Sequence, residues 1–215
     1  MIAAVVLAAG LARRMGQAKL LLPLAGQPIV RHAVEGVRSA GLDPILVVTG
    51  PEPAPIEAAL AGLGVRVVVN PVPEAGQAGS VRAGIAALPA AVDTVLIALG
   101  DQPALAPTTI PALLAAHRSS GRPIVAPRYQ DGPGNPVLFD RAIFPELLAL
   151  EGDQGARPVI ARDTARVAWV ALDLPMPQDV DTPADYEKIR GALPPTNPPT
   201  QPGGGQGTPR ARGVD

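Results

Sequence analysis

The sequence predicts an α/β protein with a mostly parallel sheet. Short apolar runs rich in Val, Ile and Leu alternate with segments of helical period along the 215 residues. The first run, residues 2–7, is β-branched and ends near a glycine, which is typical of a strand buried on both faces. Hydrophobic residues make up 47% of the chain and aromatic residues only 2%, so the core must be built from Ala, Val, Leu and Ile.

Strands are expected where apolar runs end at Gly, Pro or Asn, namely at residues 2–7, 45–49, 65–69, 94–99, 123–127, 136–139 and 167–172. Segment 20–24 is apolar but irregular and is stopped by proline, so a loop or short turn is expected there. Helical spacing, often with proline in the first turn, predicts helices over residues 28–40, 56–63, 80–88, 107–119, 142–150, 156–162 and 182–193.

This order of elements predicts a Rossmann-like, three-layer α/β/α fold with right-handed crossovers. Segments 123–127 and 136–139 have no full helix between them, which favours a mixed sheet with one antiparallel strand. We expect one domain over residues 1–193. Residues 194–215 are rich in Pro and Gly and have too few apolar side chains to fold, so a disordered tail is expected there.

Composition excludes several classes of site and partner. The chain has no cysteine, so it has no disulfide, cysteine nucleophile or thiolate metal site, and its 2 histidines argue against a multi-histidine zinc site. A net charge of -1 gives no basis for binding nucleic acid or a membrane surface. The apolar N-terminal run is too short to span a bilayer and no basic residue precedes it, so a soluble, cytoplasmic protein is expected.

The loop after the first strand carries three cations. Arg13, Arg14 and Lys19 follow the small residues of the segment ending at Gly10, where the backbone can come close to a ligand. A loop of this shape and charge predicts a polyphosphate ligand. The alternative is that the loop is only a glycine turn whose arginines are solvated and bind no ligand.

Neither common glycine fingerprint fits this loop. Ala12 and Met15 stand where the dinucleotide-binding pattern G-x-G-x-x-G needs further glycines. The P-loop pattern fails because the spacing of Gly10 and Gly16 is too long and no Lys-Ser or Lys-Thr pair follows.

Polar or small residues stand at the ends of several predicted strands, at Gly10, Thr49, Asn70 and Asp101. In open α/β sheets the ligand lies at the carboxyl ends of strands near a topological switch. Asp101 alone could be a turn former. At the same sheet edge as the cationic loop it is instead expected to hold Mg²⁺, which prefers one or two carboxylates together with phosphate oxygens and water.

Leu7-Ala8-Ala9-Gly10, then Arg14-Met15-Gly16, then Lys19 and the run to Pro23 together resemble the signature of MobA-like nucleotidyltransferases. The branch typified by molybdenum cofactor cytidylyltransferase is the most similar. The resemblance implies the nucleotide-diphospho-sugar transferase fold. It also implies that the backbone of Leu7, Ala8, Ala9 and Gly10 holds base and ribose, while Arg14 and Lys19 hold the triphosphate. Asp101 lies in a Gly-Asp-Gln-Pro segment like that of the family's metal-binding aspartate.

The segment from Asn70 to Gly84 is similar to one that helps the family select the base. The resemblance places Asn70, Gly79 and Ser80 at the nucleotide and Arg82 on the substrate side. The structural alternative is a glycine-rich loop that caps a helix, with Arg82 on its surface.

The segments around Asn135 and over 152–157 resemble family segments that border the acceptor pocket, and the segment around Asp181 resembles the family's ending. Asn135 is therefore a candidate substrate-binding residue, although Gly-Asn-Pro is ordinary turn chemistry. Alternation along an extended chain puts Asp179 and Asp181 on one face. The resemblance favours Asp181 as a second metal or substrate-side carboxylate with Asp179 in support. Asp185 is expected to be structural, in the first turn of the last helix.

Two departures from the family pattern stand out. Ala12 replaces the usual serine, so one hydroxyl contact of the phosphate loop is missing. Pro133 replaces the arginine that commonly precedes Gly-Asn-Pro, which weakens the case for an acidic acceptor at that turn.

The resemblance implies transfer of CMP from CTP to the phosphate of molybdopterin, with Mg²⁺ as cofactor, pyrophosphate as leaving group and molybdopterin cytosine dinucleotide as product. A molybdoenzyme or its chaperone would then be a partner. Ala9-Gly10 favours the cytidylyl branch, because the guanylyl branch usually carries paired glycines. The alternatives are GTP as donor, a sugar or polyol phosphate as acceptor, and a non-catalytic module that delivers nucleotide or cofactor.

Overall fold

The computed structural model describes residues 1–10 and 18–192. The predicted triphosphate ligand Arg14, the departure at Ala12 and the predicted tail 194–215 lie outside the described residues. Across those that are described, none of the helices combines the length and apolar character needed to cross a membrane.

The centre of the fold is a mixed sheet with the strand order β10-β7-β9-β6-β1-β4-β5, to which β8 adds by pairing with β7. The strands are β1 (Ile2–Ala8), β4 (Ile45–Thr49), β5 (Arg66–Val69), β6 (Thr94–Leu99), β7 (Ile124–Tyr129), β8 (Gly132–Pro133), β9 (Val137–Asp140) and β10 (Val167–Ala171). A separate two-stranded hairpin is formed by β2 (Pro23–Leu24) and β3 (Gln27–Pro28).

The sheet is parallel except at β9 and the short β8. β9 runs antiparallel to both of its neighbours, β6 and β7, which confirms the antiparallel strand expected from the missing helix before it. β1 pairs in parallel with β4 on one side and β6 on the other, so that Val6 lies beside both Val47 and Ala98. The predicted fold class is therefore confirmed.

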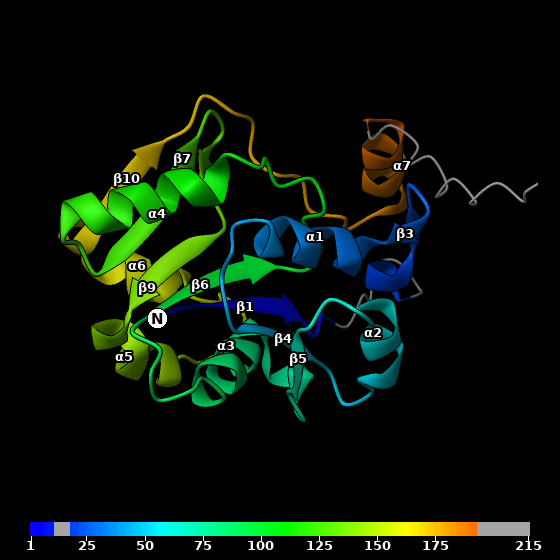
Figure 1. Ribbon diagram of the computed structural model, residues 1–215, viewed down its shortest axis with the longest axis horizontal. Helices are drawn as coiled ribbons and strands as arrows, with labels where there is room; N and C mark the ends of the chain where they lie inside the picture. The colour runs from blue at the N-terminus through cyan, green and yellow to red at the C-terminus, as the bar shows by residue number, and fades with distance from the viewer. Residues whose placement is uncertain (11–17, 193–215) are drawn as a thin grey trace, which may run out of the picture.

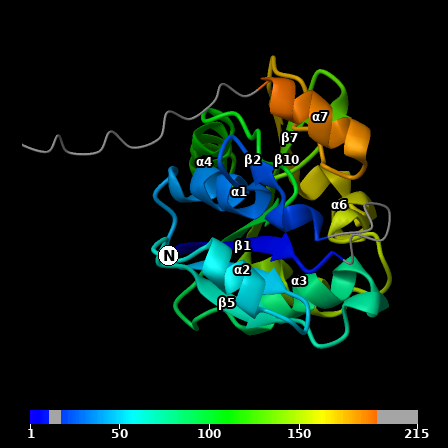
Figure 2. The same ribbon diagram turned by 90° about the vertical axis from the view of Figure 1, so that its right-hand side faces the viewer.

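Two helical layers bury opposite faces of the sheet, as Figures 1 and 2 both show for α1 and α4 on one side of β1 and α3 on the other. Alternation along β1 sends Ala4 and Val6 to the first core and Val5 and Leu7 to the second. The first core takes apolar residues of α1 (Ile29–Arg38), α2 (Ala54–Ala59), α4 (Thr109–Ser120) and α7 (Pro183–Ala192). The second takes those of α3 (Gln77–Ala86), α5 (Phe144–Leu148) and α6 (Arg157–Arg162).

Short 3₁₀ turns complete the chain at η1 (Lys19–Leu21), η2 (Pro73–Ala75), η3 (Arg141–Ile143) and η4 (Thr164–Arg166). Several predicted bounds change. Segment 20–24 contains η1 and the first hairpin strand, and the helix expected over 142–150 is divided between η3 and α5. The predicted 56–63 helix runs earlier, as Ala54–Ala59, and the chain then turns at Gly62 with φ +82.

Helix α3 begins at Gln77, before the predicted start at Ser80. Its first turn is capped from a distant segment: the N–H of Gln77 donates to the Asp153 carboxylate at 2.9 Å and the N–H of Ala78 to the Gly152 carbonyl at 3.1 Å. Because these acceptors come from a remote part of the chain, local propensity could not reveal them.

The strand order reverses at β1. The chain moves outward from β1 to β4 and β5, and α3 then returns it to β6 on the other side of β1. The carboxyl ends of β1 and β6, whose arrowheads point the same way in Figure 1, therefore lie side by side at the point where the strand order reverses, which is where open α/β sheets bind their ligands.

Candidate functional site

The centre of the site is one ammonium group held by two carboxylates. Lys19 Nζ donates to Asp101 Oδ2 and to Asp181 Oδ1, both at 2.7 Å. The side chain of Lys19 is only 8% exposed and that of Asp101 22%, whereas Asp181 is 45% exposed. Three predicted site residues that are far apart in the sequence are thus brought together at one point.

Close approach of β6 to β1 places Asp101 there. The N–H of Gly100 donates to the Leu7 carbonyl at 2.9 Å, which extends the pairing of the two strands. A Cβ at Gly100 would lie 3.0 Å from that oxygen and 3.3 Å from the Ala8 Cβ, so a side chain would crowd the end of β1. Glycine therefore allows the next residue, Asp101, to lie directly beside the end of β1.

The C-terminal segment brings the second carboxylate. The N–H of Val180 donates to the Asp101 carbonyl at 3.0 Å, and the Val180 side chain is fully buried. The next residue is Asp181, which this contact places beside Asp101. Asp185 then accepts hydrogen bonds from the Thr182 N–H and hydroxyl at the start of α7, which confirms its structural role.

The charges of this site are strongly coupled. Burial disfavours the charge on Lys19, but the Asp101 and Asp181 carboxylates outweigh burial, so the pKa of Lys19 is raised above its ordinary value. Partial desolvation of the Asp179 carboxylate, and next the negative charge of Asp101, raise the pKa of Asp179. Among the described residues, the site thus brings three carboxylates, Asp101, Asp179 and Asp181, together with one ammonium, Lys19, and a cation that lay between the carboxylates would be stabilised by them.

The donor set fits a divalent cation that brings other ligands with it. Within residues 1–10 and 18–192, no three or more His, Cys, Asp or Glu side chains gather into a group that could hold a metal ion. Asp101 and Asp181 nevertheless face one cationic nitrogen. Two carboxylates completed by phosphate oxygens and water are a normal environment for Mg²⁺.

A cavity of about 360 Å³ opens beside Lys19. Its lining combines the ends of β1 and β4 with η1 and the first turn of α2, and is formed by Ala8, Ala9, Gly10, Ala18, Lys19, Leu20, Leu21, Thr49, Gly50, Pro51, Glu52, Pro55 and Ile56. Three of the four residues expected to hold base and ribose, Ala8, Ala9 and Gly10, line it together with Lys19. The fourth, Leu7, is not among the lining residues, and its carbonyl accepts from the Gly100 N–H.

Asn70, Gly79 and Ser80 form a second group, at the end of β5 and the start of α3. Asn70 is 3% exposed; its side-chain amide donates to the Ser80 hydroxyl at 3.1 Å and its Oδ1 accepts from the Val72 N–H. A Cβ at Gly79 would lie 3.2 Å from Asn70 Nδ2. The three residues thus act together to fix the loop after β5, and their predicted contact with the base stays a prediction.

The two remaining substrate-side candidates make contacts within the protein. Arg82 donates to the Leu150 carbonyl at 2.8 Å, and the Asn135 carbonyl accepts from the Tyr129 hydroxyl at 2.6 Å. Burial raises the pKa of Tyr129 to about 12, so its hydroxyl stays protonated and remains a donor. Both residues have a structural role in addition to their predicted role toward the substrate.

Sequence reasoning missed two residues that shape this end of the sheet, Glu52 and Gln102. Thr49, singled out as a polar residue at a strand end, lines the cavity after β4 together with Glu52, where the sequence reads only as a strand break. Gln102 is 6% exposed and donates to the Asp179 carboxylate at 2.7 Å. Its place directly after Asp101 was the only available signal.

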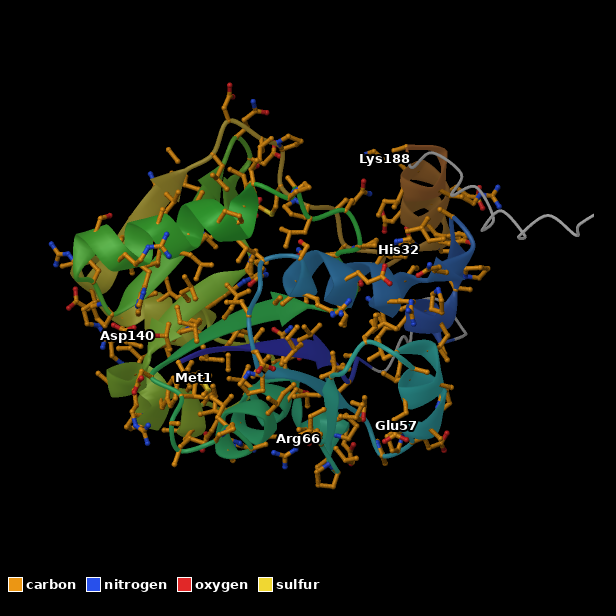
Figure 3. All side chains as sticks on the ribbon, in the orientation of Figure 1. Met1, His32, Glu57, Arg66, Asp140 and Lys188 are labelled. Atoms are coloured by element: carbon orange, nitrogen blue, oxygen red, sulfur yellow. The ribbon has the colours of Figure 1, made fainter. Side chains whose placement is uncertain are left out.

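Another titratable pair lies elsewhere. His117 Nε2 lies 2.5 Å from Asp140 Oδ1. Figure 3 places Asp140, like Met1, at the opposite end of the sheet from His32. His32 is on α1, near η1, and its Nε2 lies 2.5 Å from the Leu24 carbonyl. The His117–Asp140 pair is therefore not part of the site.

The chain is similar to known proteins over most of its length. Residues 4–178 match the model of the MobA-like NTP transferase domain. The chain is 32% identical to the purine catabolism protein PucB of Bacillus subtilis over 203 residues, which are 88% of this chain and 96% of PucB.

Two groups of solved structures share the fold at similar identity. Rv0371c of Mycobacterium tuberculosis, solved in complex with manganese, is 32% identical with a TM-score of 0.78, covering 89% of this chain and 99% of its own. Mth528, a nucleotidyl transferase from Methanothermobacter, is also 32% identical with a TM-score of 0.76, covering 89% of this chain and 97% of its own.

Proposed function

The chain belongs to the MobA-like NTP transferase family, and we propose that it transfers CMP from CTP to the phosphate of a molybdopterin-type acceptor. The class is nucleotidyl transfer; the donor, the acceptor and the product, molybdopterin cytosine dinucleotide, are the proposal. A molybdoenzyme, or a chaperone that loads it, would receive the product.

The reaction forms one phosphorus–oxygen bond and breaks another. An oxygen of the acceptor phosphate attacks the α-phosphorus of the triphosphate in line. The bond from the α-phosphorus to the oxygen that bridges it to the β-phosphate breaks, and its electron pair leaves with pyrophosphate. The acceptor phosphate is already ionised at neutral pH, so no side-chain nucleophile is required. Catalysis is therefore positioning combined with charge stabilisation.

The protein's own charges are suited to that task. Lys19 is buried and its raised pKa keeps it protonated, so it can neutralise triphosphate oxygens at any physiological pH. Arg14 is proposed as its partner on the triphosphate. Asp101 and Asp181 would hold Mg²⁺, which when bound supplies positive charge to phosphate oxygens. Manganese bound to Rv0371c supports a divalent cation in this family.

The observation that carries the proposal is the position of the Lys19, Asp101 and Asp181 cluster directly beside the cavity of about 360 Å³. Three small residues at the end of β1, Ala8, Ala9 and Gly10, line the cavity together with Lys19. A base and ribose in the cavity would direct the triphosphate toward the ammonium and the two carboxylates. A site that only binds nucleotide would not need the carboxylates, because they repel phosphate unless a cation lies between them.

Pyrophosphate release tests the proposal. The purified protein is supplied with CTP, GTP, ATP or UTP, with Mg²⁺ and molybdopterin, and released pyrophosphate is measured by a coupled assay. We expect release with CTP that depends on molybdopterin, and a product with the mass of molybdopterin cytosine dinucleotide.

Other outcomes assign the alternatives. Pyrophosphate release with GTP instead of CTP would identify GTP as the donor. Release only with a sugar or polyol phosphate would identify that compound as the acceptor. No release with any donor, although the nucleotides bind, would reject catalysis in favour of a delivery module.

A further inference from the structure

The segment that carries Asp181 is an irregular stretch of chain between β10 and α7. Asp181 lies beyond residue 178, where the match to the family domain ends. Residues 175–181 have no helical or strand structure of their own. The position of Asp181 therefore depends on the contacts that attach this segment to the end of β6.

Gln102 makes the side-chain part of that attachment. Its Nε2 donates to Asp179 Oδ1 at 2.7 Å and to the Pro177 carbonyl at 3.3 Å, which spans 77 and 75 positions of the sequence. The residue is 6% exposed. Both hydrogens of one buried amide are thus directed at the segment, on the same turn that presents Asp101.

Residue 102 is an uncharged hydrogen-bond donor beside several carboxylates. Three carboxylates gather here: Asp101 and Asp181 accept from Lys19, and Asp179 accepts from Gln102. An arginine or lysine at position 102 would pair with Asp179, but it would also add a cation that competes with a metal ion. Glutamine supplies a hydrogen bond without such a charge.

We infer that Gln102 is a positioning residue: by hydrogen bonding Asp179 and the Pro177 carbonyl, it holds Asp181 beside Asp101 so that both carboxylates face one cation. Asp179 is then an acceptor for Gln102 and not a metal ligand. The inference rests on the proposed function, since it concerns the cation that Asp101 and Asp181 would hold.

Four variants separate the roles of the two side chains. Gln102→Leu removes both hydrogen bonds at similar volume. Asp179→Leu removes the acceptor, whereas Asp179→Asn keeps an Oδ1 that can accept from Gln102 but loses the charge. Gln178→Leu is the matched control, because the Gln178 amide makes a comparable bond, 2.9 Å to Asp185, on the same segment but toward α7.

The measurement is Mn²⁺ binding by electron paramagnetic resonance in the presence of CTP without acceptor. Groups that orient metal ligands typically change affinity by about 10- to 100-fold. We expect Gln102→Leu and Asp179→Leu to weaken Mn²⁺ binding by about tenfold, and Asp179→Asn and Gln178→Leu to stay near wild type. Circular dichroism melts establish that each variant is folded.

Several results would overturn the inference. If Asp179→Asn bound Mn²⁺ as weakly as Asp179→Leu, the charge of Asp179 would matter, and Asp179 would be a metal ligand. Gln178→Leu as weak as Gln102→Leu would show that loosening the segment anywhere has the same effect. If a folded Gln102→Leu variant bound Mn²⁺ as tightly as the wild-type protein, Gln102 would have no positioning role. If the wild-type protein itself bound no Mn²⁺, the metal site would be rejected.

This readout is separate from the proposed function, because it needs neither acceptor nor turnover. If the wild-type protein releases no pyrophosphate but the variants bind Mn²⁺ in the expected order, the proposed reaction fails and the positioning role stands. If pyrophosphate is released but the variants do not differ in Mn²⁺ affinity as expected, the proposed reaction stands and the positioning role of Gln102 fails. In a preparation that releases pyrophosphate, the ratio of kcat to KM for Mg²⁺ in each variant is a second measure of how well the site holds the cation.

Discussion

Lys19 shows at the scale of one residue how a buried charge can serve binding. An ammonium with 8% of its side chain exposed would be costly without partners, and Asp101 and Asp181 supply them at 2.7 Å. The same three charges are those a metal-bound triphosphate would engage. Its phosphates would attract Lys19, and the metal ion would replace Lys19 at the carboxylates.

Asp101 is the residue whose removal should affect turnover most. We predict that Asp101→Ala reduces pyrophosphate release at least about 100-fold, because a removed charge-stabilising contact typically costs that much. Lys19 keeps its hydrogen bond to Asp181, so the variant should remain folded, which a thermal melt establishes. Asp173→Ala, which removes an exposed carboxylate bonded to Gln130, is the control. Near-normal release by Asp101→Ala would reject its assignment as the metal ligand.

At the scale of elements, the close packing of α3 on the sheet depends on one glycine. A Cβ at Gly84 would lie 2.5 Å from Val5 Cγ1 and 3.2 Å from Val48 Cγ2. Both valines are fully buried in central strands and have few alternative rotamers. Gly36 in α1 is the converse case, since a Cβ there has nothing within 4 Å.

These two glycines should respond oppositely to alanine. Gly84→Ala is predicted to lower the free energy of unfolding by up to about 2 kcal/mol, because overpacking costs ~1–3 kcal/mol and the better helix former returns ~1 kcal/mol. Gly36→Ala should raise it by about 0.5–1 kcal/mol. Urea unfolding measures both. Equal effects in the two helices would mean that Val5 and Val48 move aside freely.

Helix α7 begins with a reciprocal cap. The Thr182 N–H donates to Asp185 Oδ2 at 2.8 Å, and the Asp185 N–H donates to the Thr182 hydroxyl at 3.2 Å. The hydrogen bond from the Thr182 hydroxyl is the main cause that holds the pKa of Asp185 below its ordinary value of 3.8. The predicted helix start at this position is confirmed.

The cap predicts a pH-dependent loss of stability. Asp185→Ala should lower the melting temperature by roughly 2–4 °C near neutral pH. A lowered pKa in the folded state means that ionised Asp185 stabilises fully above its ordinary value of 3.8. That stability is lost as the pH falls through the lowered pKa, so the wild-type and Asp185→Ala melts should converge there. A difference that persists in strong acid would contradict the assignment.

For the whole molecule, strand order decides where the site lies. The return of the chain from β5 to β6 puts the ends of β1 and β6 side by side, and the segment before α7 closes over them. Residues 4–178 carry the family domain. The site is nevertheless completed by Asp181, which lies after it.

The last residues of the chain are predicted not to contribute to the folded protein. Residues 194–215 contain too few apolar side chains to add to either core, so deletion of this segment is predicted to leave pyrophosphate release and melting temperature unchanged. Parallel assays of the full chain and the shortened chain check it. A large fall in either quantity would show that the segment contributes to the folded protein.

The sequence by itself determined the α/β class, the antiparallel strand and the candidates Lys19, Asp101 and Asp181. It could do so because hydrophobic period and turn residues are local signals, and because motifs keep their order along the chain. Helix bounds were less secure, as α3 shows, because its first turn is capped by Gly152 and Asp153.

Only the tertiary structure decided which charges meet. Lys19 lies 82 positions from Asp101 and 162 from Asp181, and nothing local to any of them indicates the others. Gln102 likewise bonds to residues that lie 75 and 77 positions away in the sequence. Contacts over such separations follow from strand order and from glycine at the closest approach of β6 to β1, which exist only once the chain is folded.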